Sequence, residues 1–398
     1  MAPAASQPEL PDEVTEDILL RLDGAADVAR AAAACRSHLR VVRDRRFLLR
    51  FRSLRPPPLI GLLSSGGKLH PAEPPHSSAP AARGVASDWA GGDYPFSSLL
   101  PSRGIAAFTD WSVCDARGGR VLLYRSRRRG SGTPESAAAF LDLAVGDPLH
   151  RQFVLFPPIP DEIVLKRYSA EMRSEPFLAA ALDEEEGQCQ FQVIYNWMSN
   201  YKIDTFVFSS GTRKWRAATS FSFLPDRLIL NPKVLVRHYA GGCFCWVHFG
   251  CKHMLVLDQR EMNFSIVGLP DFNDRWSIEG LAVFGTGMTN RLGFAVLRVH
   301  PDTLELYCRN ENDNGGGGAE EWYDRSFVPL PEPGCSYKIV GAAEGYLVLE
   351  GRMQLERTRY FTLDLKTFQA ERLCMPDNAI YPAYLYASYP SLLSPPTI

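Results

Sequence analysis

Residues 10–51, LPDEVTEDILLRLDGAADVARAAAACRSHLRVVRDRRFLLRF, decide how this chain divides into parts. Pro11 and the two acids after it are typical of a helix start, because proline suits a first turn and negative charge there complements the helix dipole. Apolar residues then recur at helical spacing until Gly24, which ends the first helix. We therefore expect residues 10–55 to form a small all-α module of three helices, with a last turn that begins at Asp44.

Each expected helix is about ten residues long, and a helix of that length is marginal on its own. The apolar residues share one face of each helix, so the module needs a partner or a neighbouring domain to cover that face. These residues are Val14, Ile18, Leu19 and Leu22 in the first helix, Val28, Ala31, Ala32 and Cys35 in the second, and Leu39 and Val42 in the third.

The same stretch closely resembles the F-box, a motif of ubiquitin-ligase substrate receptors. The resemblance rests on LPDEV (10–14), ILLRL (18–22), CRS (35–37) and VVRDRRFL (41–48), which stand in register. It implies that the module docks onto the Skp-type adaptor of a cullin ubiquitin ligase. The adaptor contacts that it implies are Leu10, Pro11, Val14, Ile18, Leu19, Leu22, Val28, Ala32, Cys35 and His38.

One position departs from the F-box pattern. The family usually has tryptophan where this chain has His38. A tryptophan buries far more apolar surface than a histidine, so the resemblance implies weaker adaptor binding than is typical. The alternative for the whole module is that it packs only on its own C-terminal domain.

The composition is that of an ordinary soluble globular protein, since 45% of the 398 residues are hydrophobic and 22% are charged. The formal net charge of −2 gives no overall field that would attract nucleic acid or an acidic membrane. The opening MAPAASQPEL lacks the pattern of a secretory signal, and no stretch has the length of a membrane span. The nine cysteines are then expected to be free thiols in the cytoplasm or nucleus.

Proline and glycine mark the boundaries along the chain. Three consecutive prolines, at 56–58, end the helical part because proline cannot continue a helix. We expect a disordered N-terminus at 1–9, the helical module at 10–55, a Pro/Gly/Ser-rich connection at 56–103 with a possible strand at 59–63, a large all-β domain at 104–390, and a tail at 391–398.

Strand–turn–strand patterns recur through the large domain. They occur at 140–155, 206–215, 254–264 and 361–368, and a longer version with a loop of four glycines spans 304–327. A spacing of about fifty residues is near that of kelch-like repeats, and four strands per repeat indicate a β-propeller. Five repeats lie between residues 105 and 376, and the leftover strands at 59–63 and 383–387 would pair to complete a sixth blade. The expected fold is a six-bladed β-propeller, with seven blades or an open β-sandwich as alternatives.

A second resemblance covers most of the chain. It rests on FRSLRPPPLIGLL (51–63), DPLHRQFVLFPPIP (147–160), FVFSSGTRKWRAA (206–218) and HYAGGCFCWV (238–247). These pieces resemble the F-box-associated region of a large family of grass F-box proteins. The two resemblances together imply a non-enzymatic substrate receptor whose partners are the Skp-type adaptor, a cullin bound through it, and an unknown target protein. The alternatives are an adaptor-binding decoy or scaffold, and a propeller enzyme or sugar-binding domain with a vestigial F-box.

Candidate chemistry elsewhere is weak. Possible zinc ligands occur at short spacing at Cys243, Cys245, His248, Cys251 and His253. However, the first two alternate along an apolar strand, where free cysteine behaves as a small hydrophobe. The sequence has no catalytic or phosphate-binding motif that we recognise. We therefore expect no metal, no cofactor and no catalytic residues.

The target is expected to bind loops on one face of the propeller, because loops carry binding residues while a rigid scaffold positions them. Exposed aromatic residues and arginines are favoured anchors at protein interfaces. The candidates in turn-like segments are Trp197, Tyr201, Arg275 and Trp276. The alternative is that the tryptophans are core residues between blades.

Overall fold

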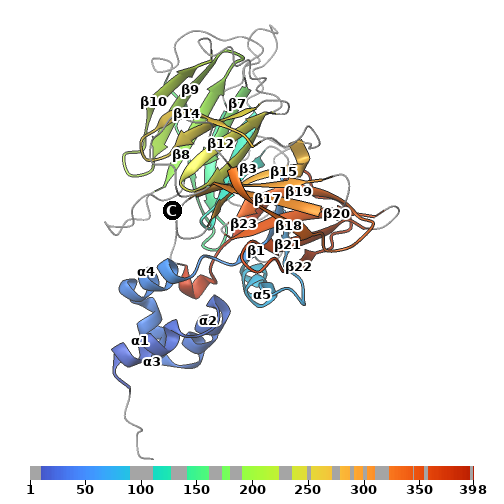
Figure 1. Cartoon of the computed structure of the whole chain (residues 1–398). Coiled ribbons are helices and arrows are strands. Elements are labelled where there is room, and N and C mark those ends of the chain that lie inside the picture. The colour runs from blue at the N-terminus through green and yellow to red at the C-terminus, as the bar shows by residue number, and fades with distance from the viewer. Residues whose placement is uncertain are drawn as a thin grey trace, which may run out of the picture.

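The structure is a computed structural model of the whole chain (Figure 1). It describes residues 10–89, 111–126, 141–160, 173–179, 191–223, 235–248, 252–270, 278–286, 291–298, 303–309, 322–343, 345–353, 357–394 and 398.

The helical module has four helices, where the sequence predicted three. They are α1 (Asp12–Leu20), α2 (Ala25–Ala34), α3 (Arg36–Arg43) and α4 (Arg45–Leu54). The predicted last turn is a complete helix because Asp44 caps it: its Oδ1 accepts a hydrogen bond of 2.7 Å from the backbone N–H of Arg46. Phe47 and Phe51 of α4 are both buried, so packing supports this helix as well as its cap.

The described residues between 59 and 387 form a six-bladed β-propeller, which excludes the alternatives of seven blades and an open sandwich. Five blades have four antiparallel strands that follow one another in the chain. The blades are β3 (Ser112–Arg117), β4 (Arg120–Ser126), β5 (Leu141–Asp147) and β6 (Gln152–Leu155); β7 (Arg173–Leu178), β8 (Gln192–Met198), β9 (Lys202–Ser209) and β10 (Lys214–Ser222); β11 (Leu235–Ala240), β12 (Cys243–His248), β13 (His253–Asp258) and β14 (Asn263–Gly268); β15 (Leu281–Thr286), β16 (Arg291–Leu297), β17 (Thr303–Arg309) and β18 (Trp322–Pro329); and β19 (Ser336–Ala343), β20 (Tyr346–Arg352), β21 (Arg359–Asp364) and β22 (Ala370–Cys374).

The sixth blade joins strands from the two ends of the sequence. It contains β1 (Leu59–Ser64), β2 (Leu69–Pro71) and β23 (Ala383–Ala387), in the order β2-β1-β23. The predicted pairing of the leftover strands is therefore confirmed. This pairing removes the two sheet edges that an unclosed ring would expose.

The predicted connection at 56–103 is partly folded. Besides β1 and β2 it contains a helix, α5 (Ala79–Asp88), whose Ala82 and Val85 are buried against the closing blade. Trp89, directly after α5, stacks edge-on against Tyr386 of β23 at 5.1 Å between ring centroids. Proline and glycine in this stretch thus mark turns and a helix start within the domain, and the structure corrects the linker prediction for residues 64–89.

The repeated strand–turn–strand patterns correspond to hairpins between the third and fourth strands of blades. In three of these hairpins an aspartate side chain accepts hydrogen bonds from the backbone N–H groups two and three residues later. These aspartates are Asp147, Asp258 and Asp364, and the residues four positions on, Arg151, Met262 and Phe368, have φ between 52° and 57°. The shared turn explains why the repeats are visible in the sequence despite their low similarity.

Apolar clusters fill the spaces between neighbouring blades. Phe177 of β7 and Phe244 of β12, for example, lie 4.5 Å apart between ring centroids. The cluster around the closing blade reaches both of its neighbours, since it contains Val121 of β4 as well as Val348 of β20. The six blades therefore form one continuous ring of packed sheets.

Strand direction gives the ring two distinct ends. The innermost strand is the first strand of each four-stranded blade and β23 in the closing blade, as the contacts of β23 with β3, β3 with β7, β11 with β15, β15 with β19 and β19 with β23 show. Residue 58 lies between the helical module and β1, and residue 388 directly follows β23. These two residues lie together at one end of the ring, here called the module end. Because each blade is an antiparallel meander, turns between second and third strands lie at the other end, here called the distal end.

Among the described residues, no helix is both long enough and apolar enough to cross a membrane.

Candidate protein-docking surface

The first helix carries a row of exposed apolar side chains. Leu10, Val14 and Ile18 are four positions apart, so they lie on one face of α1 and of the turn that begins it. Their exposed fractions are 56%, 44% and 48%, and Pro11 beside them is exposed too. These four residues are called the α1 stripe. A contiguous exposed apolar surface of this kind is typical of a protein-binding site.

The opposite face of α1 forms the core of the helical module. Thr15, Leu19 and Leu20 are buried there. The same core contains Val28 and Ala32 of α2, Val41 and Val42 of α3, and Phe47 and Phe51 of α4. The module is therefore packed without using the α1 stripe, which leaves the stripe available to a partner.

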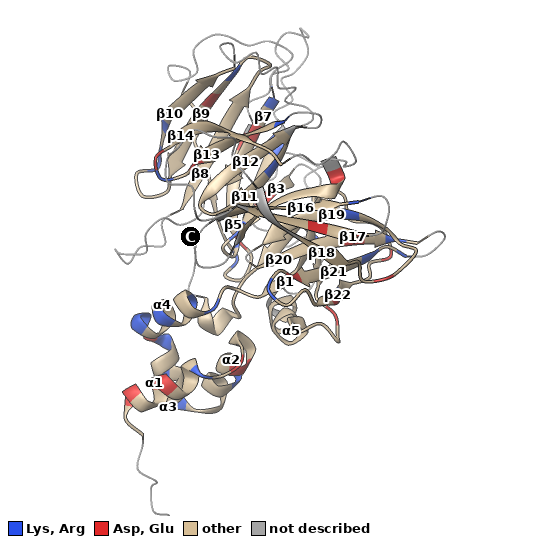
Figure 2. Cartoon of the chain, viewed as in Figure 1, with Lys and Arg blue, Asp and Glu red and all other residues tan. Residues whose placement is uncertain are grey.

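Ion pairs hold α1 against α3 and α4. Arg40 Nη2 lies 2.6 Å from Asp12 Oδ1, and Arg50 Nη1 lies 3.0 Å from Glu16 Oε1. The hydrogen bond to Glu16 raises the pKa of the Arg50 guanidinium. Figure 2 shows this division of charge, with acidic residues on α1 and basic residues on α3 and α4. Such exposed pairs link α1 to α3 and α4 but add little stability.

The structure corrects three of the predicted adaptor contacts. Leu19, Val28 and Ala32 are at most 1% exposed and belong to the module core, so they cannot reach a partner. Helical spacing shows that these residues share an apolar face, but not whether that face meets the module's own core or another protein.

The remaining predicted contacts lie partly at the surface. Leu22, Cys35 and His38 are all half-buried. Cys35 Sγ is 2.9 Å from Ser37 Oγ, and His38 Nδ1 is 3.2 Å from the carbonyl oxygen of Ala31. His38 thus lies against the last turn of α2.

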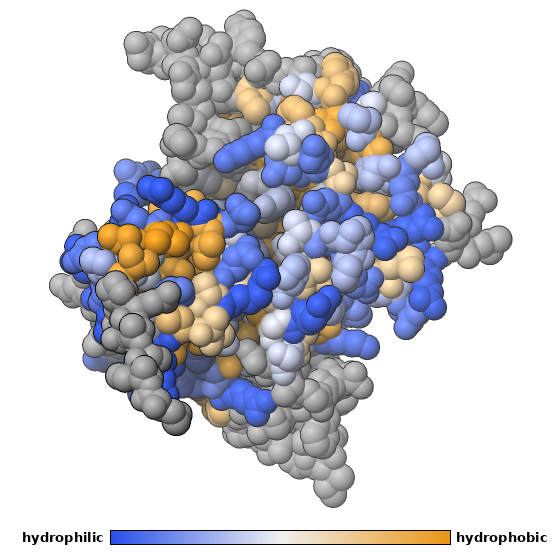
Figure 3. Space-filling model, turned by 90° about the horizontal axis from the view of Figure 1, so that it is seen from below, coloured by the Kyte–Doolittle hydropathy of each residue, from blue (hydrophilic) through white to orange (hydrophobic). Residues whose placement is uncertain are grey.

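Helix α4 adds apolar surface that sequence reasoning missed. Leu49 and Leu54 are 36% and 61% exposed. Figure 3, which views the molecule from below, shows a hydrophobic patch beside hydrophilic residues on that face. Recognising α4 as a full helix would have identified these two leucines, because the RRFLLRFRSL pattern has more apolar residues than one buried face needs.

The predicted target-binding residues of the propeller differ in their exposure to solvent. Trp197 of β8 is only 6% exposed and packs between two blades, so the prediction that it binds a target is wrong. Tyr201, in the turn between β8 and β9, is 55% exposed at the distal end. Tyr381, just before β23 and also at the distal end, is 85% exposed and was not predicted. Arg275 and Trp276 lie outside the described residues.

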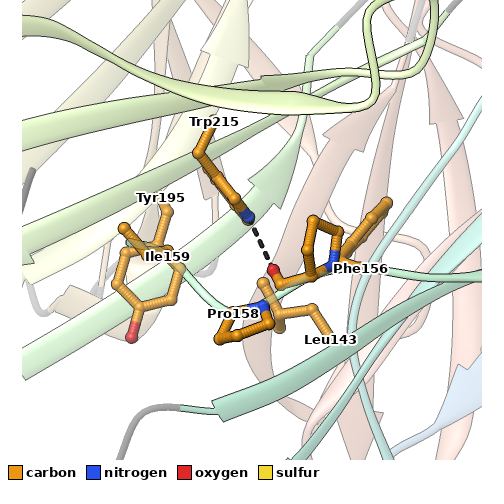
Figure 4. A pocket seen from close by; sticks show the side chains of 7 residues that line it. Leu143, Phe156, Pro158, Ile159, Tyr195 and Trp215 are labelled. Carbon is orange, nitrogen blue, oxygen red and sulfur yellow. Dashed lines mark hydrogen bonds between the residues drawn. The ribbon is translucent and has the colours of Figure 1, made fainter. Parts of the chain in front are cut away.

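A small pocket between two blades is shown in Figure 4. Trp215 Nε1 donates a hydrogen bond of 2.8 Å to the carbonyl oxygen of Pro157 across it. The enclosed space is about 10 Å³, which holds no more than one water molecule. The pocket is therefore a packing feature of the Pro157 loop rather than a site for a substrate.

Two of the thiols that resembled a zinc site, Cys243 and Cys245, are part of the sheet, whereas Cys251 lies outside the described residues. Cys245 is fully buried in β12, and burial raises the pKa of its thiol far above the usual value. Burial also raises the pKa of Cys243. No group of three or more possible metal ligands occurs among the residues that the structure describes.

Comparisons with known proteins add only distant likeness. No protein-family model and no curated protein matches the chain. TolB from Acinetobacter baumannii is 15% identical with a TM-score of 0.35, over 65% of this chain and 53% of TolB. The β-propeller domain of the Trilobed protease from Pyrococcus furiosus is 11% identical with a TM-score of 0.34, over 67% of this chain and 71% of that domain. This chain thus spans about half the length of TolB, and scores this low say nothing of function.

Proposed function

We propose that this chain is the substrate-recognition subunit of a Skp–cullin–F-box ubiquitin ligase. In this proposal the α1 stripe docks onto the Skp-type adaptor and the propeller binds the protein that is to be ubiquitinated. The observation that carries the proposal is the exposed row Leu10, Val14 and Ile18 on a module whose own core is complete without it. The resemblance of residues 10–48 to the F-box names the partner.

Such a subunit performs no covalent chemistry of its own. It holds the target close to the ubiquitin-loaded enzyme, so that a bimolecular encounter becomes an effectively intramolecular one. A small helical module attached to a large rigid ring suits this role, because each part can bind a different protein.

We place target binding at the distal end of the propeller. Tyr201 and Tyr381 are large exposed side chains there, and tyrosine is one of the favoured anchors of protein interfaces. The module end carries the adaptor-docking module, so the two partners would approach opposite ends of the ring. We further propose that the protein acts in the cytoplasm or nucleus, where its free thiols would stay reduced.

Binding of purified Skp-type adaptor to the full chain tests the docking surface. Ile18→Asp replaces a 48% exposed apolar side chain with a carboxylate that the interface would desolvate. We expect affinity to fall by at least about a hundredfold, which corresponds to roughly 3 kcal/mol. The matched control is Phe327→Asp on β18, where the side chain is 59% exposed but belongs to the propeller.

The outcome separates the alternatives. Equal adaptor binding by Ile18→Asp and the unchanged chain would disprove the docking proposal. Adaptor binding without recruitment of cullin would identify a decoy or scaffold. Failure of the control Phe327→Asp to bind would show that capture depends on general hydrophobic adhesion instead of the α1 stripe.

A further inference from the structure

The seven residues after β23 are folded into the helical module. Residues 388–394, here called the coupling segment, were predicted to fall mostly in a tail, and the structure corrects that prediction. Within the segment lies a short 3-10 turn, η5 (Ser391–Leu393), which contacts α2 and α3. Tyr389 is 9% exposed and Leu393 is fully buried. Both belong to the same apolar core as the four helices.

Specific contacts join this segment to α4. The Tyr389 ring packs edge-on against Phe51, with 6.0 Å between ring centroids. Tyr389 Oη donates a hydrogen bond of 2.5 Å to the carbonyl oxygen of Arg55, and Arg52 Nη2 donates one of 2.9 Å to the carbonyl oxygen of Leu393. The Arg52 guanidinium also lies 5.4 Å from the centre of the Tyr389 ring. The segment is therefore held by packing, hydrogen bonds and a cation–π contact together.

Two passages of chain connect the module to the propeller, and they run side by side. The first is residues 55–58, between α4 and β1, and the second is the coupling segment. The backbone N–H of Ser388 donates a hydrogen bond of 3.2 Å to the carbonyl oxygen of Pro58. A single passage would let the module rotate about it, whereas two linked passages restrict that rotation.

We infer that the coupling segment is a positioning element. It completes the core of the helical module, and it holds the α1 stripe in a fixed orientation relative to the distal end of the propeller. Its biological meaning rests on the proposed function: a fixed orientation would set where a bound target stands relative to the adaptor. Tyr389 and Leu393 are the positioning residues, although neither belongs to the α1 stripe or the distal end.

The structural part of this inference is testable in the free full-length chain. Hydrogen exchange reports on the module helices, and small-angle scattering reports on the distribution of distances between module and propeller. Leu393→Ala leaves a cavity beside α2 and α3 and should speed exchange of the α2 and α3 amides by about tenfold or more. The distance distribution should broaden, while exchange in the propeller strands stays unchanged.

Two further variants sharpen the result. Tyr389→Phe keeps the ring but removes its hydrogen bond to Arg55, so it should produce a smaller change in the same direction. Ser391→Ala alters an exposed side chain of the same segment and should change neither readout. A chain carrying Leu393→Ala with the exchange and scattering of the unchanged protein would overturn the inference.

Adaptor binding distinguishes this inference from the proposed function. If Leu393→Ala loosens the module but the unchanged chain binds no adaptor, the coupling role stands and the proposed function fails. If the unchanged chain binds and Leu393→Ala has normal exchange and scattering, the coupling role fails and the proposed function stands. If the module amides of Leu393→Ala lose all protection from hydrogen exchange, that result would support the core-completing role. The distance distribution of Tyr389→Phe would then test whether the segment holds the module in a fixed orientation.

Discussion

Leu62 of β1 and Leu385 of β23 are direct partners in the antiparallel pairing that closes the ring. Leu62 is fully buried, so its replacement by alanine should lower the free energy of unfolding by about 2–5 kcal/mol. The matched control is Leu155→Ala in β6, where the leucine is 44% exposed and the expected loss is under about 1 kcal/mol. Urea denaturation checks both values, and equal losses would contradict a packed seam.

Removal of β23 should have a larger effect than any point change in it. A chain that ends after Pro376 loses the partner of β1, the fully buried Tyr386 and the whole coupling segment. An apolar strand edge would then be exposed, so we expect insoluble protein. Solubility and thermal melting are the measurements. A soluble truncation that melts cooperatively would contradict the need for ring closure.

Replacing His38 with tryptophan should strengthen adaptor binding. His38 is half-buried beside the last turn of α2, and in the proposed function a tryptophan there would add apolar surface to the docking face. The expected gain is on the order of 1 kcal/mol at most, or about fivefold in affinity. Calorimetric titration with the adaptor measures it. Unchanged or weaker binding would place His38 away from the interface.

The half-buried imidazole of His238 should make stability depend on pH. Its Nε2 has no hydrogen-bond partner among the described residues, and burial, together with the charge of Arg237, lowers its pKa to about 4. The unfolded chain takes up this proton near pH 6.5 and the folded chain does not, so stability is complete above that pH and falls toward pH 4.

This His238 contribution should be on the order of 2 kcal/mol between pH 6.5 and pH 4. His238→Gln removes the titrating group, so its urea-unfolding free energy should fall less over that range than that of the unchanged chain. Burial lowers the pKa of His76 as well, which leaves some pH dependence in both proteins. Parallel pH profiles for the two chains would contradict the assignment to His238.

Tyr201 and Trp197 form a test pair for target recognition, because they are close in sequence but differ in exposure. Tyr201→Ala should weaken binding of a co-purifying target at an unchanged melting temperature, since the side chain is 55% exposed. Trp197→Ala should cost about 3–5 kcal/mol of stability because the ring is buried between blades. Retention of every partner by Tyr201→Ala and by Tyr381→Ala would place the target site elsewhere.

Much of this fold could be predicted from sequence because its signals are local. The hairpin turns of Asp147, Asp258 and Asp364 repeat, and the leftover strands at the two ends of the ring could only pair with each other. The sixth blade followed from that count. The sequence did not predict β2, the third strand of the closing blade, or helix α5. The Pro and Gly residues at 64–89 are equally compatible with a long loop and with compact turns between short elements.

The candidate site was predicted less well, for a physical reason. Helical periodicity places both Ile18 and Leu19 on an apolar helix surface, but Ile18 is 48% exposed and Leu19 is 1% exposed. Deciding between them requires knowing where α2, α3 and α4 pack. Tyr389 and Leu393 were missed because their partners lie more than 300 positions earlier in the chain, and no short pattern reports such a contact.

The seam between β1 and β23 also sets the order in which this protein can fold during synthesis. The apolar strand LIGLLS emerges from the ribosome roughly 320 residues before the strand that completes its blade. At a typical elongation rate of about 5–20 residues per second, β1 waits some tens of seconds without that partner. The nascent chain therefore passes through a long period in which its first β-strand can pair with the wrong edge. A chaperone that shields residues 59–64 would act on the step most prone to misfolding.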